Sequence, residues 1–419
     1  MLEQLEGSQA VARAVAMCRP EVIPAYPISP QTHIVERLSA MVGEGQLAPC
    51  EFINVESEFG AMSLAIGASA AGARTYTATA SQGLLYMVEA LYNAAGLGLP
   101  TVMTVANRAI GAPINIWNDH SDSMSQRDSG WIQLYVESNQ EAVDTHVLAF
   151  RLAEQLSLPV MVCMDGFILT HAYEQVDIPD QEEVDGFLPP YEPRQVLDPA
   201  EPVTIGAMVG PEAFTEVKYL AHVKQAQALD LIPELSLELE ASLGRPQAGL
   251  LRTYRLEDAE TVVVALGSVL GTVEDVLDAR RGRGEPVGAL GIKAFRPFPL
   301  QEVREALAGA ARVVVLEKAL AVGIGGIVAQ DVRTALAGLD TPVHTVIAGL
   351  GGRPITSASL ERLLDEARAG RLAQLSFLDL DTELVERELA RTRERRNSGP
   401  HAENMLRDLG VIAAGPTLG

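Results

Sequence analysis

The residues of this chain that could do chemistry lie next to apolar segments, where a side chain can be held in place. Ser29 stands between two prolines at the end of the apolar segment 21–26. Glu58 heads a run of small and apolar residues at 58–72. The prolines hold the backbone extended around Ser29, and a helix through 58–72 would be buried nearly all round. A hydroxyl and a carboxylate in such places can bind a polar ligand and share a proton with it.

Each of these two residues also has an ordinary structural explanation. Ser29 can be the N-cap or a turn hydroxyl of the helix expected from residue 31 onward. Glu58 can be a first-turn carboxylate that interacts favourably with a helix N-terminus. A carboxylate that leads a buried helix must nevertheless find a partner. On these residues alone, both explanations stay open.

Two further segments carry polar side chains directly after apolar strands. Ser81 and Gln82 follow the strand expected at 74–79, and Arg108 follows the strand expected at 100–106. A guanidinium matches a carboxylate or phosphate in two-point geometry, although a structural ion pair explains Arg108 equally well. Because parallel α/β sheets bind ligands at the carboxyl ends of their strands, we expect these segments to meet near Ser29.

Three other motifs suggest a function, but a structural explanation is better for each. Residues 118–122 (Asn-Asp-His-Ser-Asp) include metal-ligand types, yet their crowding on one loop is typical of a hydrogen-bonded turn. Residues 323–326 (Gly-Ile-Gly-Gly) do not form the GxGxxG pattern of dinucleotide-binding proteins, and a tight strand–helix turn is predicted. His171 follows the strand-like segment 167–170 and is predicted to be a hydrogen-bonded core histidine. No metal site is predicted for this chain.

Composition and charge exclude several classes of protein. With 419 residues, 47% of them hydrophobic, the chain can bury sizeable cores, and two or three domains are expected. Lysine and arginine number 32 against 55 acidic residues, which gives a net charge of −23. Such a charge argues against nucleic acid or an anionic membrane as the main partner.

The cysteines and the apolar runs restrict the cofactors and the location. Cys18, Cys50 and Cys163 lie far apart and form no CxxC pair. This chain alone is therefore not expected to hold a disulfide scaffold, a zinc site or an iron–sulfur cluster. The first residues are too acidic for a signal peptide, and no apolar run reaches 18 residues. We expect no membrane insertion and a cytoplasmic location.

The apolar pattern predicts an α/β fold with mostly parallel sheets. In the first half, helices are expected at 7–18, after 30, and at 58–72, 81–95 and 141–155, with strands at 22–26, 52–55, 74–79, 100–106 and 160–164. In the second half, strands are expected at 260–267, 288–292, 312–317 and 342–347, with helices at 269–280, after 299, and ending at 337.

Shifts in composition suggest the domain boundaries. A first domain is predicted at 1–250, including a proline- and acid-rich excursion at 171–250 that contains one helix, at about 212–242. A second, smaller α/β domain is predicted at 251–380, and a charged helical tail at 381–419.

Short motifs spread along the chain form an ordered set. They are residues 26–36 (beginning Tyr-Pro-Ile-Ser-Pro), 57–60, 79–83, 107–111, 116–122, 165–171, 295–299, 316–320 and 323–326. This set resembles the α subunits of 2-oxoacid:ferredoxin oxidoreductases, over about residues 7–375. The Phe-Arg-Pro-Phe-Pro segment and the lack of a fused γ region look most like the separate α subunits of its pyruvate-oxidising members. One position departs from the family pattern, because Ser29 stands where threonine is usual.

The resemblance implies a thiamine diphosphate enzyme, with a pyrimidine-binding domain followed by a smaller domain like the transketolase C-terminal domain. Glu58 would hydrogen-bond N1′ of the aminopyrimidine and share the acid–base work with it. Ser81 and Gln82 would contact the cofactor. Arg108 would bind the carboxylate of a 2-oxoacid, and Ser29 would add a hydroxyl contact. The methyl group missing at Ser29 would loosen the substrate end of the pocket.

The resemblance also implies partner subunits. The chain has neither a GDG…N motif for Mg²⁺ and diphosphate nor a cysteine run for clusters. A β subunit would supply the Mg²⁺ and diphosphate contacts and a cluster, and γ and δ subunits would complete the assembly. Iron–sulfur clusters in these partners would pass electrons to ferredoxin or a similar acceptor, and the acyl group would go to coenzyme A.

Two alternatives to a pyruvate enzyme stay open. The same chemistry could act on an aromatic or branched 2-oxoacid such as phenylglyoxylate, indolepyruvate or 2-oxoisovalerate. The small residues Gly111 and Ala112 beside Arg108 are compatible with a bulkier acid. A non-catalytic scaffold subunit is the more distant alternative, and the presence of Glu58, Arg108 and a hydroxyl at position 29 argues against it.

Overall fold

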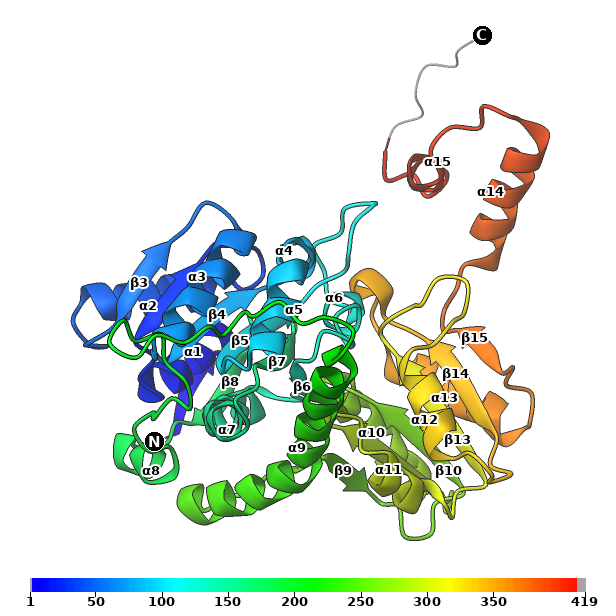
Figure 1. Ribbon diagram of the computed structural model, residues 1–419. Coiled ribbons are helices and arrows are strands. Elements are labelled where there is room, and N and C mark those ends of the chain that lie inside the picture. The colour runs from blue at the N-terminus through cyan, green and yellow to red at the C-terminus, as the bar shows by residue number, and fades with distance from the viewer. Residues whose placement is uncertain (1, 413–419) are drawn as a thin grey trace.

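Two mostly parallel β-sheets, each covered by helices, form the body of the molecule (Figure 1). The computed structural model describes residues 2–412. The predicted α/β fold with parallel sheets is confirmed. Continuous apolar strands such as β5 (Thr101–Asn107) and β7 (Val160–Asp165) are buried along their whole length, as strands covered on both faces must be.

The first sheet has seven strands, and all of its pairings are parallel except that of the edge strand β12. The strand order is β12 (Ala294–Arg296), β6 (Ile132–Tyr135), β7, β5, β4 (Thr75–Thr79), β2 (Val22–Ala25) and β3 (Glu51–Asn54). The main helices around it are α1 (Gly7–Met17), α2 (Thr32–Gly43), α3 (Glu58–Ala70) and α7 (Asn139–Leu156). Strand β12 comes from the second half of the chain, so the two halves share this sheet.

The second sheet has six strands, and only its edge strand β9 is antiparallel. The order is β15 (Leu375–Phe377), β14 (Val343–Ile347), β13 (Arg312–Glu317), β10 (Thr261–Ala265), β11 (Val287–Ile292) and β9 (Leu251–Tyr254). Its helices are α10 (Val269–Arg281), α11 (Leu300–Leu307), α12 (Val328–Ala335) and α13 (Ser357–Arg368).

Several local predictions were wrong. Residues 167–170 form a turn and not a strand. Strand β7 ends at Asp165, and the backbone then makes local hydrogen bonds, for example from the Leu169 N–H to the Asp165 carbonyl (2.8 Å). The helix expected at 81–95 is two helices, α4 (Ser81–Tyr86) and α5 (Val88–Leu97), although the apolar pattern runs on across the break.

The excursion at 171–250 holds more structure than the one helix expected from the sequence. Besides α9 (Phe214–Leu243), it contains β8 (Tyr173–Asp177) and α8 (Gln181–Phe187). Strand β8 pairs in antiparallel fashion with β1 (Leu2–Glu6), and α9 packs against α7. The short strands β1, β6, β8 and β9 carry too little periodicity to be predicted from the sequence.

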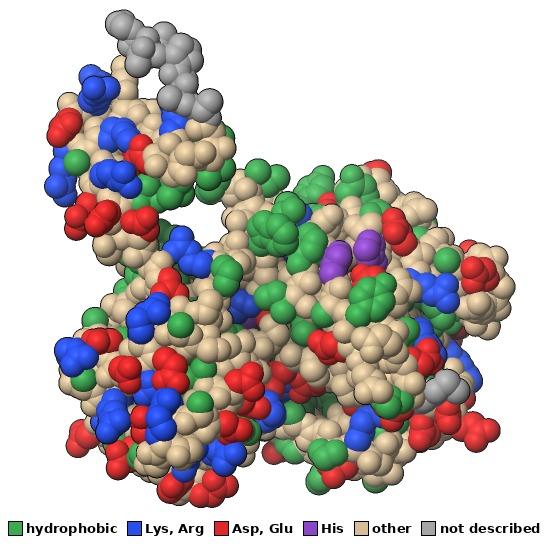
Figure 2. All heavy atoms as spheres, turned by 180° about the vertical axis from the view of Figure 1, so that it is seen from behind, with side chains coloured by type: hydrophobic (Ala, Val, Ile, Leu, Met, Phe, Trp, Pro, Cys, Tyr) green, Lys and Arg blue, Asp and Glu red, His purple; other side chains and the backbone are tan. Residues whose placement is uncertain are grey.

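The C-terminal helices α14 (Thr382–Glu394) and α15 (His401–Asp408) stand away from both sheets (Figures 1 and 2). They are joined through the buried carboxylate of Glu388, which accepts hydrogen bonds from the Asn404 side chain (3.0 Å) and pairs with His401 (2.7 Å). Residues 413–419 of the predicted charged tail lie outside the described part of the chain. Within residues 2–412, every helix is too short or too polar to cross a membrane.

The two sheets meet at a buried aspartate. Asp165 ends β7, and its Oδ2 accepts hydrogen bonds from Lys318 Nζ (2.9 Å) and the Ser268 N–H (3.0 Å), both at the end of strands of the second sheet. Its Oδ1 binds His120 Nε2 (2.6 Å) and the Asn118 side chain (3.2 Å). The carboxyl edges of the two sheets are therefore held against each other.

Replacing Lys318 with methionine tests this junction. Burial would raise the pKa of Asp165, but Lys318, His120 and Ser268 hold it well below its ordinary value. Leaving this carboxylate without its cation is expected to lower the free energy of unfolding by about 3–5 kcal/mol at pH 7. Because the native pKa lies below the unfolded one, the contribution is present above about pH 4 and is lost as the pH falls further.

Denaturant unfolding of the purified protein at pH 7 and below pH 4 measures this difference. The matched control is Arg371→Met, which removes an exposed ion pair with Glu366 and should change the free energy of unfolding by less than about 0.5 kcal/mol. Equal losses in the two variants at pH 7, or a larger loss for Lys318→Met at low pH, would contradict the role of the junction.

Candidate functional site

Four segments that carry the predicted site residues come together at the carboxyl edge of the first sheet. They follow β2, β3, β4 and β5, which run parallel to one another. Ser29 lies in the loop after β2, Glu58 begins α3 after β3, Ser81 begins α4 after β4, and Arg108 follows β5. The predicted convergence of these side chains therefore has its physical basis in the strand direction.

Glu58 is a buried carboxylate without an internal partner. It is the first residue of α3, and the helix is capped by the preceding residue, since the Ser57 hydroxyl accepts a hydrogen bond from the Gly60 N–H (3.1 Å). Only 8% of Glu58 is exposed, and its carboxylate makes no hydrogen bond or ion pair with any other described residue. Because a buried carboxylate needs a partner, Glu58 is suited to accept a hydrogen bond from a bound ligand.

Gly83 lets α4 lie directly against Glu58. A Cβ atom at this position would stand 2.7 Å from Glu58 Oε1 and 2.6 Å from the Thr79 hydroxyl. The Thr79 hydroxyl is itself buried and has no hydrogen-bond partner among the described residues. Gly83 was not predicted as a site residue, although its place in the Ser-Gln-Gly motif is the signal that could have found it.

Ser81 and Gln82 shape the first turn of α4. Ser81 is fully buried with a left-handed φ of 48°, and its hydroxyl is within hydrogen-bond distance of the Ala109 carbonyl (2.5 Å) and of the Gln82 side chain. The Gln82 amide nitrogen lies 2.6 Å from the place where a Cβ on Gly111 would stand. The loops after β4 and β5 are thus packed together, and a side chain at Gly111 would push Gln82 away.

Arg108 is a buried cation whose guanidinium has no acidic partner. It is 7% exposed, and its guanidinium donates to two carbonyl oxygens, those of Ser29 (3.0 Å) and Asn115 (3.1 Å). No carboxylate in the described part of the chain forms an ion pair with it, so the structural ion-pair explanation was wrong. Burial lowers the pKa of Arg108, and the nearby Asp122 carboxylate opposes that shift. The remaining guanidinium donors are available to an anionic ligand.

Ser29 lies beside Arg108 but does not cap a helix. Helix α2 begins at Thr32 with Gln31 as its N-cap, and no side chain bonds to the free N–H groups there. Ser29 is exposed, and its hydroxyl bonds to no other residue within the described ranges. The N-cap explanation was therefore wrong, and the hydroxyl remains free to contact a ligand held by Arg108.

Comparison with known proteins gives the family. The model described as "Pyruvate flavodoxin/ferredoxin oxidoreductase, thiamine diP-bdg" matches residues 13–235, and that of the pyruvate:ferredoxin oxidoreductase core domain II matches residues 259–360. Pyruvate synthase subunit PorA of Methanosarcina barkeri is 48% identical over 390 residues, which cover 91% of this chain and 97% of that relative. The chain belongs to the pyruvate flavodoxin/ferredoxin oxidoreductase family.

Two further comparisons give a second relative and a solved structure of similar fold. Ketoisovalerate oxidoreductase subunit VorA of Pyrococcus horikoshii is 37% identical over 382 residues, covering 90% of this chain and 96% of that relative. A solved 2-oxoglutarate:ferredoxin oxidoreductase from Magnetococcus marinus has the same fold, with a TM-score of 0.68 at 19% identity. That likeness covers 87% of this chain, and the chain spans 65% of the length of the solved one.

The residues present fit the cofactor named by the family. The matched thiamine diphosphate-binding region, residues 13–235, contains all five predicted site residues. N1′ of an aminopyrimidine ring needs a carboxyl group with which it can share a proton, and Glu58 is a buried carboxyl group that no other described residue binds. Asp165, in the segment Met-Asp-Gly, is the residue most similar to the aspartate of a GDG motif for Mg²⁺. Its carboxylate already binds Lys318, His120 and Ser268, so it is not free to bind a metal ion.

The glycine-rich turn at 323–326 is not a phosphate site. Its helix, α12, is capped by the buried carboxylate of Glu317, which accepts hydrogen bonds from the N–H groups of Ile327 (2.7 Å), Val328 (2.8 Å) and Ala329 (2.9 Å). A Cβ on Gly326 would stand 2.1 Å from Glu317 Oε1. The glycine is therefore needed for the carboxylate, which fills the place where a dinucleotide phosphate would bind. The predicted tight strand–helix turn is instead a turn closed by backbone hydrogen bonds between Ala321 and Gly325, within the longer loop 318–327 that joins β13 to α12.

The other two structural predictions had different outcomes. In the loop 118–122, Asp119 accepts hydrogen bonds from the Ser121 N–H (3.0 Å) and hydroxyl, as expected of a hydrogen-bonded turn. His171 does not lie in the core. It is partly exposed, and its ring lies 4.9 Å from that of His33 and 4.7 Å from that of Phe167.

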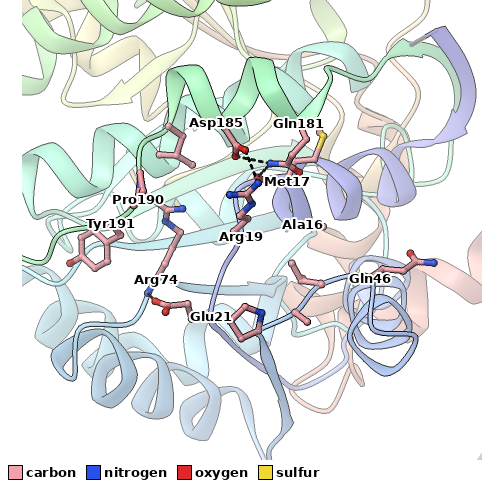
Figure 3. A pocket seen from close by; sticks show the side chains of 14 residues that line it. Ala16, Met17, Arg19, Glu21, Gln46, Arg74, Gln181, Asp185, Pro190 and Tyr191 are labelled. Atoms are coloured by element: carbon pink, nitrogen blue, oxygen red, sulfur yellow. Dashed lines mark hydrogen bonds and ion pairs between the residues drawn. The ribbon is translucent and has the colours of Figure 1, made fainter.

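The pocket in Figure 3 lies at the opposite, amino-terminal edge of the first sheet. It measures about 600 Å³, and its lining includes Glu21 and Arg74, which directly precede β2 and β4. Both of its arginines are already paired, Arg19 with Asp185 (2.6 Å) and Arg74 with Glu154 (2.5 Å). Since parallel sheets bind ligands at their carboxyl edge, this pocket is not the candidate site.

Proposed function

We propose that this chain is the α subunit of a thiamine diphosphate-dependent pyruvate:ferredoxin oxidoreductase. The reaction converts pyruvate, coenzyme A and an oxidised acceptor to acetyl-CoA, CO₂ and a reduced acceptor. The observation that carries the proposal is one unpartnered buried carboxylate, Glu58, at the same sheet edge as one buried guanidinium without an acidic partner, Arg108. The high identity to pyruvate synthase subunits supports the choice of substrate.

Glu58 supplies the acid–base part of the site. When bound, thiamine diphosphate supplies a carbon nucleophile and accepts the electron pair released on decarboxylation. Glu58 would hydrogen-bond N1′ of the aminopyrimidine and share a proton with it. Its carboxylate lies against Gly83, where a Cβ atom would stand 2.7 Å from Oε1. Ser81 and Gln82, in the first turn of α4, contact the cofactor.

Arg108 and Ser29 hold the substrate. The Arg108 guanidinium is fixed by two carbonyl oxygens and directs its remaining donors to the carboxylate of the 2-oxoacid. The Ser29 hydroxyl adds a second contact to the same group. Orientation by these contacts would place the keto carbon beside the bound cofactor, with the carboxylate as the group that is lost as CO₂. The absence of a methyl group at Ser29 makes this end of the pocket wider than in relatives with threonine.

The active complex needs partner subunits. Neither the Mg²⁺–diphosphate motif nor a cysteine run for clusters is in this sequence. A β subunit supplies the Mg²⁺ and diphosphate contacts at a shared site, and γ and δ subunits complete the assembly. Iron–sulfur clusters in the partners carry the electrons to ferredoxin or a similar acceptor. We place this complex in the cytoplasm, where coenzyme A and ferredoxin are available. We further propose the division into 1–250, 251–380 and 381–419.

Turnover with four acids tests the substrate. The native complex is assayed anaerobically with a viologen dye, coenzyme A and thiamine diphosphate, on pyruvate, 2-oxoisovalerate, indolepyruvate and phenylglyoxylate. We expect kcat/KM for pyruvate to exceed the others by at least about tenfold, since a pocket shaped for a methyl group discriminates by about that much. A preference for a branched acid, as the name of the VorA relative suggests, would show the alternative. No turnover with any acid would indicate a scaffold subunit.

Glu58→Gln tests the acid–base role. The amide cannot share the N1′ proton, so we expect kcat to fall by at least about 100-fold. The complex should still assemble, because Glu58 makes no bond to other described residues. The matched control is Glu56→Gln, an exposed carboxylate two residues earlier, which should keep full turnover. Near-normal decarboxylation in Glu58→Gln would rule out this role.

Arg108→Ala tests the carboxylate contact. Loss of a buried charge contact worth about 2–4 kcal/mol would raise the KM for pyruvate by about 30- to 1000-fold. Thiamine diphosphate binding should change much less. Arg108→Lys separates charge from geometry, because lysine keeps the charge without the two-point contact. An unchanged KM in both variants would place the carboxylate contact elsewhere in the site.

A further inference from the structure

The two loops that form the site are joined by one buried carboxylate that the proposed reaction does not use. Asp122 lies in the short helix α6 (Ser121–Met124) and is 0% exposed. Its Oδ2 accepts hydrogen bonds from the backbone N–H groups of Ser81 (2.9 Å) and Arg108 (2.9 Å). A single oxygen atom therefore connects the first residue of α4 with the residue that follows β5.

The other oxygen fixes Asp122 itself. Its Oδ1 accepts hydrogen bonds from the Asn107 side chain (2.8 Å) and from the Ser123 N–H (2.8 Å). The Ser123 hydroxyl in turn bonds to the Tyr135 hydroxyl (2.6 Å) of β6. Burial raises the pKa of Asp122 to about 7, while its N–H donors oppose the rise. These donors replace the hydrogen bonds to water that a carboxylate loses on burial. No cation within residues 2–412 forms an ion pair with Asp122.

The backbone on both sides of this contact needs such support. Ser81 has a φ of 48°, in the left-handed region that non-glycine residues rarely adopt. Two residues later, Gly83 lies against the Glu58 carboxylate. On the other side, the direction of the Arg108 side chain depends on where its own N–H is held. Asp122 therefore links the turn that packs against Glu58 with the residue that carries the guanidinium.

We propose that Asp122 is a positioning residue that fixes the Ser81–Gly83 turn and Arg108 relative to each other, and so aligns the cofactor side of the site with the substrate side. The inference rests on the proposed function for its kinetic part. Its structural part, the hydrogen bonds to the two backbone N–H groups, can be measured whether or not the enzyme acts on pyruvate.

The kinetic test compares Asp122→Asn and Asp122→Ala in the assembled complex. Asparagine keeps one acceptor oxygen and alanine keeps none, so the effects should be graded. We expect both the KM for pyruvate and the half-saturating concentration of thiamine diphosphate to rise, by about tenfold or more for alanine and less for asparagine. The matched control is Asp144→Asn. Asp144 is a buried aspartate of α7 that accepts a hydrogen bond from Arg245 (2.6 Å), and its replacement should change both constants by less than about twofold.

A milder variant guards against failure to fold. Asn107→Ala removes one of the hydrogen-bond donors to Asp122 and leaves its three backbone N–H donors in place, and the Asn107 Oδ1 atom has no described partner to lose. The same two constants should rise together, by about threefold. A change in thermal stability without a change in either constant would reduce Asp122 to a structural role and overturn the proposal.

Hydrogen–deuterium exchange of the complex without cofactor gives a readout that does not depend on activity. In Asp122→Ala, the amides of Ser81 and Arg108 should exchange faster by at least about tenfold, while those of the control Asp144→Asn keep the wild-type rates. Unchanged exchange at both amides would overturn the proposal. A wild-type complex that is inactive on all 2-oxoacids would contradict the proposed function, and this exchange experiment would then decide the positioning role alone.

Discussion

The contact of Asp165 with Lys318 and Ser268 is the constraint on which the rest of the structure depends. It joins the carboxyl edge of the first sheet to that of the second, through residues more than 100 positions apart in the chain. A buried charge pair of this kind contributes modestly to stability but requires one geometry, because either charge alone would be costly to bury. His120 binds the same carboxylate, so the loop that leads to Asp122 is held by the same contact.

Three buried carboxylates near this edge differ in the groups that bind them. Asp165 is paired with a cation, and its pKa lies well below the ordinary value. Asp122 is bound only by neutral donors, and its pKa is raised to about 7. Glu58 has no partner among the described residues. The first joins the sheets, the second joins two loops, and the third is the contact that we propose for the cofactor. A buried group without a partner gains the most from a hydrogen bond to a ligand.

The glycines at the site serve close packing between side chains and backbone. Gly83 allows α4 to touch Glu58, and Gly326 allows Glu317 to cap α12. In both places a Cβ atom would stand within 3 Å of a carboxylate oxygen. The glycine at 326, a residue type typical of phosphate sites, thus makes room for the carboxylate of Glu317. A glycine-rich turn predicts close approach of some group, but not which group.

The sequence by itself determined the α/β fold, most of its helices and strands, and the positions of Ser29, Glu58, Ser81 and Arg108 at strand ends. These follow from local periodicity, and parallel strands necessarily bring their carboxyl ends to one edge. Only the tertiary structure decided that Glu58 lacks a partner, that Arg108 has no ion pair, and that Asp122 and Asp165 hold the loops. Such contacts join residues 14 to 153 positions apart, and local patterns carry no information on pairing at those separations.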